Sequence, residues 1–181
     1  LVTTASGNLV QGNSISTNGT TDNYGMLLQS SANNNTIANN TIRTQGSSSN
    51  YGIYLFTTVS GNLVQGNSIS TNGTSFNYGM LLQSSANNNT ITNNTLRTDG
   101  SGVSNIGIYL LTTVSGNFVH GNSINTNGTN ANYGMKLESS ASNNTIANNT
   151  IRTGGSSFSN IGIYLVTTAS GNLVQGNSIS T

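Results

Sequence analysis

The sequence contains no proline, cysteine or tryptophan, and only 4% of its 181 residues are charged. The absence of cysteine excludes a disulfide framework. The absence of proline suits a chain whose backbone N–H groups are needed in sheets. With a net charge of +1, the chain is not basic enough to attract a polyanion, so we expect no nucleic-acid partner. No apolar run is long enough to span a membrane.

Repetition is what the sequence has instead. The segment Gly-Asn-Leu-Val-Gln-Gly-Asn-Ser-Ile begins at Gly7, Gly61 and Gly171, and a close variant begins at Gly116. Long repeats therefore cover 7–60, 61–115 and 116–170, and 171–181 starts the next. Each long repeat has two similar halves, because one asparagine recurs every 27 or 28 residues, at Asn8, Asn35, Asn62, Asn89, Asn117, Asn144 and Asn172. We interpret each half as one coil of a single array that covers 1–181 and has no obvious capping coil.

Apolar residues occupy equivalent positions in successive coils. One such row reads Val10, Ile37, Val64, Ile91, Val119, Ile146 and Val174. Other rows pass through Ile15, Met26 and Leu28, and a row of small residues passes through Ala5. Within a coil these positions alternate with polar ones, which is the pattern of strands, and no stretch has helical periodicity. The sequence predicts an all-β fold, a parallel β-helix (β-solenoid) of about 6.5 coils with about 27 residues each.

Two corners of each coil are recognisable from glycine and asparagine. Gly and Asn alternate from coil to coil at the positions of Gly7 and Asn34, and again at those of Gly12 and Asn39. Both residue types tolerate the left-handed backbone conformation, so we expect a bend there. An unbroken asparagine row follows each corner, and the second row is Asn13, Asn40, Asn67, Asn94, Asn122, Asn149 and Asn177. Stacked amides of this kind predict a hydrogen-bonded ladder along the axis.

The pattern Asn-x-Ile-x-x-Asn-x-Ile, followed by Tyr-Gly-Ile-Tyr-Leu, resembles the parallel β-helix repeats of the pectin-lyase-like superfamily. It is most similar to NosD-type and archaeal or bacterial surface-protein repeats. The resemblance covers the whole chain and implies a right-handed coil, a secreted or cell-surface location, and often contact with carbohydrate. Polysaccharide lyases and hydrolases of that superfamily have acidic clusters with Lys or Arg on one face, and this chain has no such cluster.

Few residues could carry chemistry. The three acids are Asp22, Asp99 and Glu138, and Asp22 and Asp99 fall in loops three coils, or roughly 14 Å, apart, which is too far for paired-carboxylate catalysis. We expect Glu138 to form a surface ion pair with Lys136. The single histidine, His120, has no second metal ligand beside it. We therefore predict no catalytic site, no metal, no cofactor and no enzymatic activity.

Two surface features, an arginine row and an apolar stripe, could contact partners. Arg43, Arg97 and Arg152 recur two coils apart, a spacing that limits repulsion between their charges. Alternatively, this row binds an anionic polymer or a neighbouring chain. Outward positions form an apolar stripe, and contiguous apolar patches mark interfaces, although loops could cover it. The stripe comprises Leu27, Tyr54, Phe56, Leu81, Tyr109, Leu111 and Tyr164.

Two further expectations concern the loops between coils. Asn-x-Thr sequons there place candidate glycosylation sites at Asn18, Asn72 and Asn127, although chance explains many sequons in so Asn-rich a chain. Ile106 and Ile161 stand where other coils have tyrosine, and we expect Val103 and Phe158 to fill the space.

The leading hypothesis is a structural extracellular fibre or cell-surface stalk. We expect self-association end to end, and laterally through the stripe. The alternative is an adhesin or carbohydrate-binding module that uses the same stripe or the polar loops. Ice binding would need a flat outward Thr-x-Thr array, whereas the outward rows are mixed.

Overall fold

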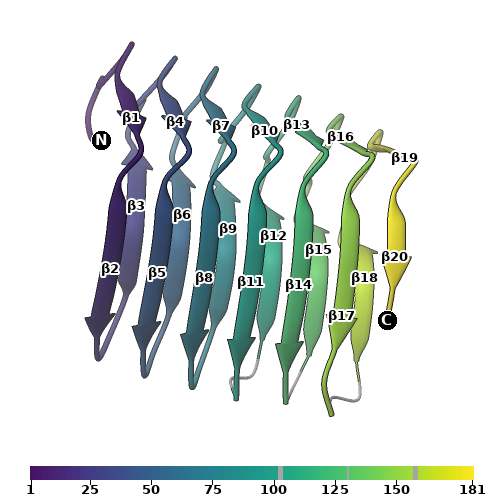
Figure 1. Ribbon diagram of the computed structural model, residues 1–181. Coiled ribbons are helices and arrows are strands. Elements are labelled where there is room, and N and C mark those ends of the chain that lie inside the picture. Colours follow the sequence, from purple (N-terminus) through teal and green to yellow (C-terminus); the bar gives the residue numbers. More distant parts are fainter. Residues whose placement is uncertain (102–103, 130, 157–158) are drawn as a thin grey trace.

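The computed structural model describes residues 1–101, 104–129, 131–156 and 159–181. The described residues form twenty strands that stack into three parallel sheets. The two chain termini lie at opposite ends of the stack (Figure 1). The molecule is therefore a column of coils, and each complete coil contributes one strand to each sheet.

The first sheet consists of short strands: β1 (Leu9–Gln11), β4 (Thr36–Ala38), β7 (Leu63–Gln65), β10 (Thr90–Thr92), β13 (Phe118–His120), β16 (Thr145–Ala147) and β19 (Leu173–Gln175). The second consists of β2 (Ser14–Gly19), β5 (Thr41–Gly46), β8 (Ser68–Gly73), β11 (Thr95–Gly100), β14 (Ser123–Gly128), β17 (Thr150–Gly154) and β20 (Ser178–Ser180). The third consists of β3 (Asn23–Gln29), β6 (Asn50–Phe56), β9 (Asn77–Gln83), β12 (Asn105–Leu111), β15 (Asn132–Glu138) and β18 (Asn160–Leu165).

Each strand pairs with the strand one coil away, so residues 27 or 28 apart lie over one another. Val10 pairs with Ile37 in the first sheet, and Ile15 pairs with Ile42 in the second. The predicted rows are confirmed, and so is the all-β parallel solenoid. Among the described residues the first two sheets have seven strands each and the third has six, close to the 6.5 coils predicted.

The glycine and asparagine corners are left-handed, as predicted, and their alternation has a steric cause. Gly61 and Asn34 have φ values of 67° and 56°. A Cβ on Gly61 would lie 2.4 Å from Asn34 Oδ1, and a Cβ on Gly66 would lie 2.4 Å from Asn39 Oδ1. The asparagine side chain of one coil thus lies over the glycine of the next. Two neighbouring coils could not both have a side chain there unless one of them moved.

A third left-handed corner, between the third and first sheets, was not predicted. Thr57 and Thr58 have φ values of 60° and 55°, and Ser30 and Ser31 have values of 55° and 65°. Positive φ is rare for a β-branched residue. The corner is held by the next coil, because Thr57 N donates to Gln83 O at 3.2 Å, and by side chains, because Ser31 Oγ lies 3.0 Å from Thr58 Oγ1.

Aliphatic rows fill the interior, and one glycine row allows two sheets to approach each other. The rows through Ile37, Leu55 and Val59 are buried in the inner coils and become exposed at the ends of the column, as at Val174 and Leu165. In the third sheet, a Cβ on Gly79 would lie 2.8 Å from Leu96 Cδ2 of the second sheet and 2.6 Å from the carbonyl oxygen of the next glycine in the row, Gly107. Only glycine fits between these sheets without displacing a neighbour.

The predicted asparagine ladder is confirmed by a hydrogen bond between every pair of neighbours in the row Asn13, Asn40, Asn67, Asn94, Asn122, Asn149 and Asn177. The row that begins at Asn8 is bonded in the same way. A third ladder, which was not predicted, joins Asn23, Asn50, Asn77, Asn105, Asn132 and Asn160. Three amide ladders therefore run along the column.

Candidate interaction face

The outward side of the third sheet gathers aromatic and aliphatic residues that are far apart in sequence. The strand register pairs Tyr24 with Tyr51 and Leu27 with Tyr54 but skips Gly25. The strand changes its alternation at this glycine. Tyr24 and Leu27, three residues apart, consequently pack in the same outer cluster, whereas strict alternation would group Tyr24 with the core residue Met26. Sequence reasoning missed the tyrosine row for this reason.

All seven tyrosines of the chain belong to this side of the third sheet: Tyr24, Tyr51, Tyr54, Tyr78, Tyr109, Tyr133 and Tyr164. We call the surface they form with the predicted stripe the outer aromatic face. It comprises these tyrosines together with Leu27, Phe56, Leu81, Leu111, Lys136 and Glu138. The face extends along all six strands of the third sheet.

The rings are packed against one another along the axis. Ring centroids lie 5.0 Å apart for Tyr24 and Tyr51, 5.5 Å for Tyr51 and Tyr78, and 5.7 Å for Tyr78 and Tyr109. Within one coil, Tyr51 stacks on Tyr54 at 5.2 Å. Such pairs stabilise a structure by about 0.5–1.5 kcal/mol beyond the area they bury. These contacts connect the rings of the first four strands, from Tyr24 to Tyr109, into one series.

The predicted stripe residues are outward, but they cover one another. Tyr54, Leu81 and Tyr109 retain only 9%, 3% and 7% of their surface exposed. Leu27, Phe56 and Leu111 pack against them and stay partly exposed, and Tyr164 stacks on Tyr133 with centroids 5.6 Å apart. What faces solvent is thus the rim of a packed layer.

A charged pair interrupts this apolar layer. Lys136 Nζ lies 2.6 Å from Glu138 Oε2, which confirms the expected ion pair. The ammonium also lies 5.2 Å from the ring centroid of Tyr109 and 5.6 Å from that of Tyr133, within cation–π range. The Tyr109 hydroxyl donates to Glu138, and two coils earlier the Tyr54 hydroxyl donates to Gln83 at 2.5 Å.

Burial and hydrogen bonding change the acidity of these groups. The hydrogen bond from Lys136, followed by that from Tyr109, lowers the pKa of Glu138. Burial, and then the bond to Glu138, raises the pKa of Tyr109 well above 10. Burial raises the pKa of Tyr54 and Tyr78 in the same direction. At neutral pH the cluster therefore holds an ionised carboxylate beside neutral phenols.

The candidate glycosylation residues are exposed, but their predicted location is wrong. Asn18, Asn72 and Asn127 lie in strands β2, β8 and β14 rather than in loops. Asn18 pairs in register with Gln45, and the ladder continues to the following glycine, Gly19. At the equivalent glycine of the next coil, Gly46, a Cβ would lie 2.2 Å from the carbonyl oxygen of Gly19, so the preceding coil leaves no room for a side chain there.

The remaining candidates do not assemble into a site. Arg97 lies over Ser70 and under Asn125, as predicted, and it forms an unpredicted ion pair with Asp99, which lies in strand β11 and not in a loop. His120 stacks on Phe118, with centroids 5.3 Å apart. In the part of the chain that the structure describes, no group of three potential ligands could hold a metal ion.

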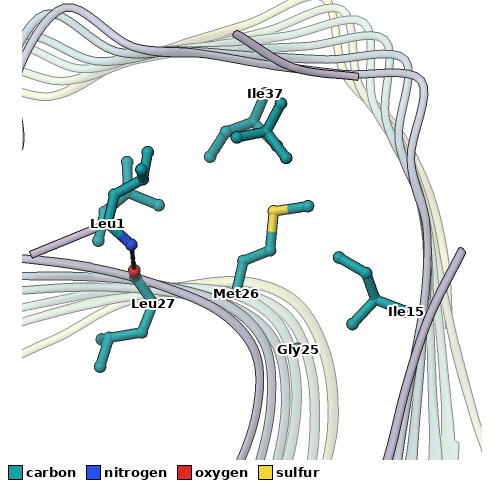
Figure 2. A pocket seen from close by; sticks show the side chains of 8 residues that line it. Leu1, Ile15, Gly25, Met26, Leu27 and Ile37 are labelled. Carbon is teal, nitrogen blue, oxygen red and sulfur yellow. Dashed lines mark hydrogen bonds between the residues drawn. The ribbon is translucent and has the colours of Figure 1, made fainter. Parts of the chain in front are cut away.

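Two hollows lie near the ends of the column, and Leu27 of the outer aromatic face borders the first. One, of about 280 Å³, is bounded by the first coils, where Leu1, Ile15, Met26 and Ile37 surround it (Figure 2). Its lining side chains are all apolar, and the Leu1 amino group beside it donates to the carbonyl oxygen of Leu27 at 2.8 Å. The other, of about 490 Å³, is polar and includes Arg152. Val103 and Phe158, expected to fill space near isoleucines, lie outside the described residues.

No helix among the described residues is long and apolar enough to cross a membrane.

Comparison with known proteins agrees with this architecture. Searches of curated proteins and of solved structures returned no match. The model of the family described as "Right handed beta helix region" matches residues 1–151. Because that match covers most of the chain and every described sheet is parallel and stacked coil on coil, the protein belongs to the right-handed β-helix family.

Proposed function

We propose that this chain is a structural element, a segment of an extracellular fibre or cell-surface stalk, whose copies associate laterally through the outer aromatic face. The observation that carries the proposal is the gathering of all seven tyrosines on one side of one sheet. A chain with only 33% hydrophobic residues needs those residues for its core. An aromatic layer on its outer surface is therefore typical of an interaction site.

The rest of the molecule is consistent with a mechanical role. The coils are joined by three parallel sheets and three amide ladders, so each coil is bonded to both of its neighbours. Nearest-neighbour bonding of this kind makes the array, rather than the coil, the folding unit. The resemblance to surface-protein repeats supports an extracellular or cell-surface location. End-to-end contact between copies is a further part of the proposal.

The packing of the rings favours a protein partner over a sugar. A sugar stacks on an open ring face, whereas Tyr51 already stacks on Tyr24 and Tyr54. The buried Tyr54 and Tyr109 hydroxyls are already bonded to Gln83 and Glu138. Tyrosine edges, leucine and phenylalanine remain at the rim, and tyrosine and phenylalanine are enriched in protein interfaces.

The test uses replacements that the repeat itself provides. Phe56 and Leu111 occupy a row in which other coils have Gln29 and Gln83. We expect the double variant Phe56→Gln/Leu111→Gln to fold but to associate at least tenfold more weakly, because two apolar side chains worth about 1–2 kcal/mol each leave the interface. Sedimentation and small-angle scattering of the purified chain measure the association and the cross-section of the assembly.

The control removes equal apolar surface from another sheet. Leu63 and Phe118 belong to a row in the first sheet in which other coils have threonine, such as Thr90. The variant Leu63→Thr/Phe118→Thr should associate like the wild type. A wild-type chain that stays a single column at high concentration would overturn the proposal, and selective binding in a glycan screen would favour the adhesin alternative.

A further inference from the structure

The charged pair on the outer aromatic face is a departure from the repeat. Its strand, β15, reads Met-Lys-Leu-Glu where β3 and β9 both read Met-Leu-Leu-Gln. Leucine has become Lys136 and glutamine has become Glu138 in the same coil, so that the two changes add one charge of each sign. The whole chain has only four basic and three acidic residues, and two of these seven lie here, within an apolar layer.

The pair is held in a defined geometry. Its two side chains are only 19% and 24% exposed. Lys136 is fixed by the rings of Tyr109 and Tyr133 as well as by Glu138. Glu138 in turn accepts the Tyr109 hydroxyl. Because the positions are set before any partner arrives, the face presents a plus and a minus charge in a fixed order along the strand.

The surroundings of the pair offer no other charge. In the register, Lys136 lies between Tyr109 and Tyr164, and Glu138 lies beside Leu111. A partner that covers the face must therefore bring its own charges to this coil, or cover the pair with apolar surface. Covering charges with apolar surface is costly.

A second copy meets this requirement in only one of the two symmetric arrangements. If the twofold axis runs along the stack, the two columns are parallel and facing strands run in opposite directions. Lys136 of one copy then lies opposite Glu138 of the other, and the reverse contact forms as well. The two pairs close into a ring of four alternating charges, while every other coil meets its own equivalent.

Other arrangements lose this match. In an antiparallel pair that keeps all six strands overlapped, β15 lies opposite β6, and the charges face Tyr54 and Phe56. A parallel pair displaced by one coil, about 4.8 Å, places Lys136 opposite Leu111. We propose that the Lys136–Glu138 pair sets the register and polarity of lateral association, so that columns pair in parallel and coil for coil. This inference rests on the proposed function, because it requires lateral association to occur.

The test measures distances between labels on paired columns. The chain has no cysteine, so a single Ser47→Cys or Ser156→Cys change gives one spin-label site, in the exposed turns that precede β6 and β18. Parallel in-register columns give one narrow distance of similar length at both sites. A register slip offsets the paired labels along the axis by about 4.8 Å per coil, and reversed pairing offsets them by three or more coils, about 14 Å or more. Both offsets lengthen the distance between the labels.

The decisive variant is Lys136→Leu/Glu138→Gln, which restores the residues of the other long repeats. We expect it to associate at least as strongly as the wild type but to give a broad distribution with several maxima. The matched control is Arg97→Ser/Asp99→Asn, which removes the ion pair of the second sheet and installs residues that the row already contains at Ser70 and Asn72. Its distribution should stay narrow.

The outcomes separate the two proposals. If the wild type does not associate, both fail. If it associates but the Lys136→Leu/Glu138→Gln variant keeps the same narrow distance, lateral association stands and the register role is overturned. Loss of association in that variant would also overturn the register role, because the pair would then be the source of the attraction.

Discussion

At the level of single residues, the asparagine rows are unbroken because every hydrogen-bond donor and acceptor of the side-chain amide is satisfied. Asn67 Nδ2 donates to Asn94 Oδ1 at 2.9 Å and to Ile37 O at 3.0 Å. Its Oδ1 accepts both the Nδ2 and the backbone N–H of Asn40, at 3.0 and 2.9 Å. A primary amide has two donors and two acceptor sites, so all four are satisfied. No other side chain of this length offers the same set.

Asn67→Asp should therefore be among the most damaging single changes. It removes both donors and buries a carboxylate against the Oδ1 of Asn94, so we expect a loss of about 3 kcal/mol or more in the free energy of unfolding. Asn13→Asp changes the outermost, exposed rung of the same ladder and should lose far less. Urea denaturation of the two variants provides the measurement, and equal losses would refute the ladder as a source of stability.

At the scale of the element, strands β12 and β15 are joined by a pH-sensitive contact. The pKa of Glu138 is lowered in the folded chain from its usual value of 4.5, mainly by the hydrogen bond from Lys136. A lowered folded pKa means that the carboxylate stabilises the fold at pH values above 4.5. This stabilisation is lost as the pH falls from there through the lower folded value. The group is partly exposed, so its effect on stability is modest.

Glu138→Gln should flatten this dependence. Glutamine keeps an acceptor for the Tyr109 hydroxyl, as Gln83 does for Tyr54, but it does not titrate. We expect the variant to resemble the wild type at low pH and to be less stable above pH 5. Melting temperatures between pH 3 and pH 7 test this, and parallel curves for the two proteins would contradict the assignment.

At the scale of the whole molecule, two coils rather than one are the structural unit. A side chain at Gly61 would displace the Asn34 amide of the preceding coil, and one at Gly66 would displace the Asn39 amide. The arginine row likewise alternates with small polar residues such as Ser70. The repeat of 54 or 55 residues is therefore a packing requirement and not only a record of duplication.

Deleting one coil should accordingly cost more than deleting two. Removal of residues 61–87 brings Asn88 beside Asn34 and Arg97 beside Arg43, which crowds the corner and places like charges in contact. We expect the chain lacking residues 61–87 to have a free energy of unfolding about 2 kcal/mol below that of the chain lacking residues 61–115. Its melting temperature should be about 4–8 °C lower. Thermal unfolding followed by circular dichroism decides between them, and a lower melting temperature for the two-coil deletion would contradict the two-coil unit.

The features that repeat from coil to coil could be predicted from the amino-acid sequence alone. In a solenoid the neighbours of a residue are its equivalents one coil away, so a row such as Val10 and Ile37 can be found by aligning the chain with itself. The left-handed glycine and asparagine corners and two of the three ladders were found in the same way. The Ser and Thr corner was missed, because nothing in residues such as Thr57 and Thr58 signals a positive φ.

The cross-section of the coil, in contrast, depends on contacts between sheets. Gly25 reverses the alternation because the second and third sheets approach too closely there for a Cβ, which would lie 2.2 Å from Ile42 Cγ2. That contact lies between sheets, and no periodicity along the chain reveals it. It turns the Tyr24 row outward to join Leu27, and so it makes the predicted stripe part of a wider, aromatic-rich face.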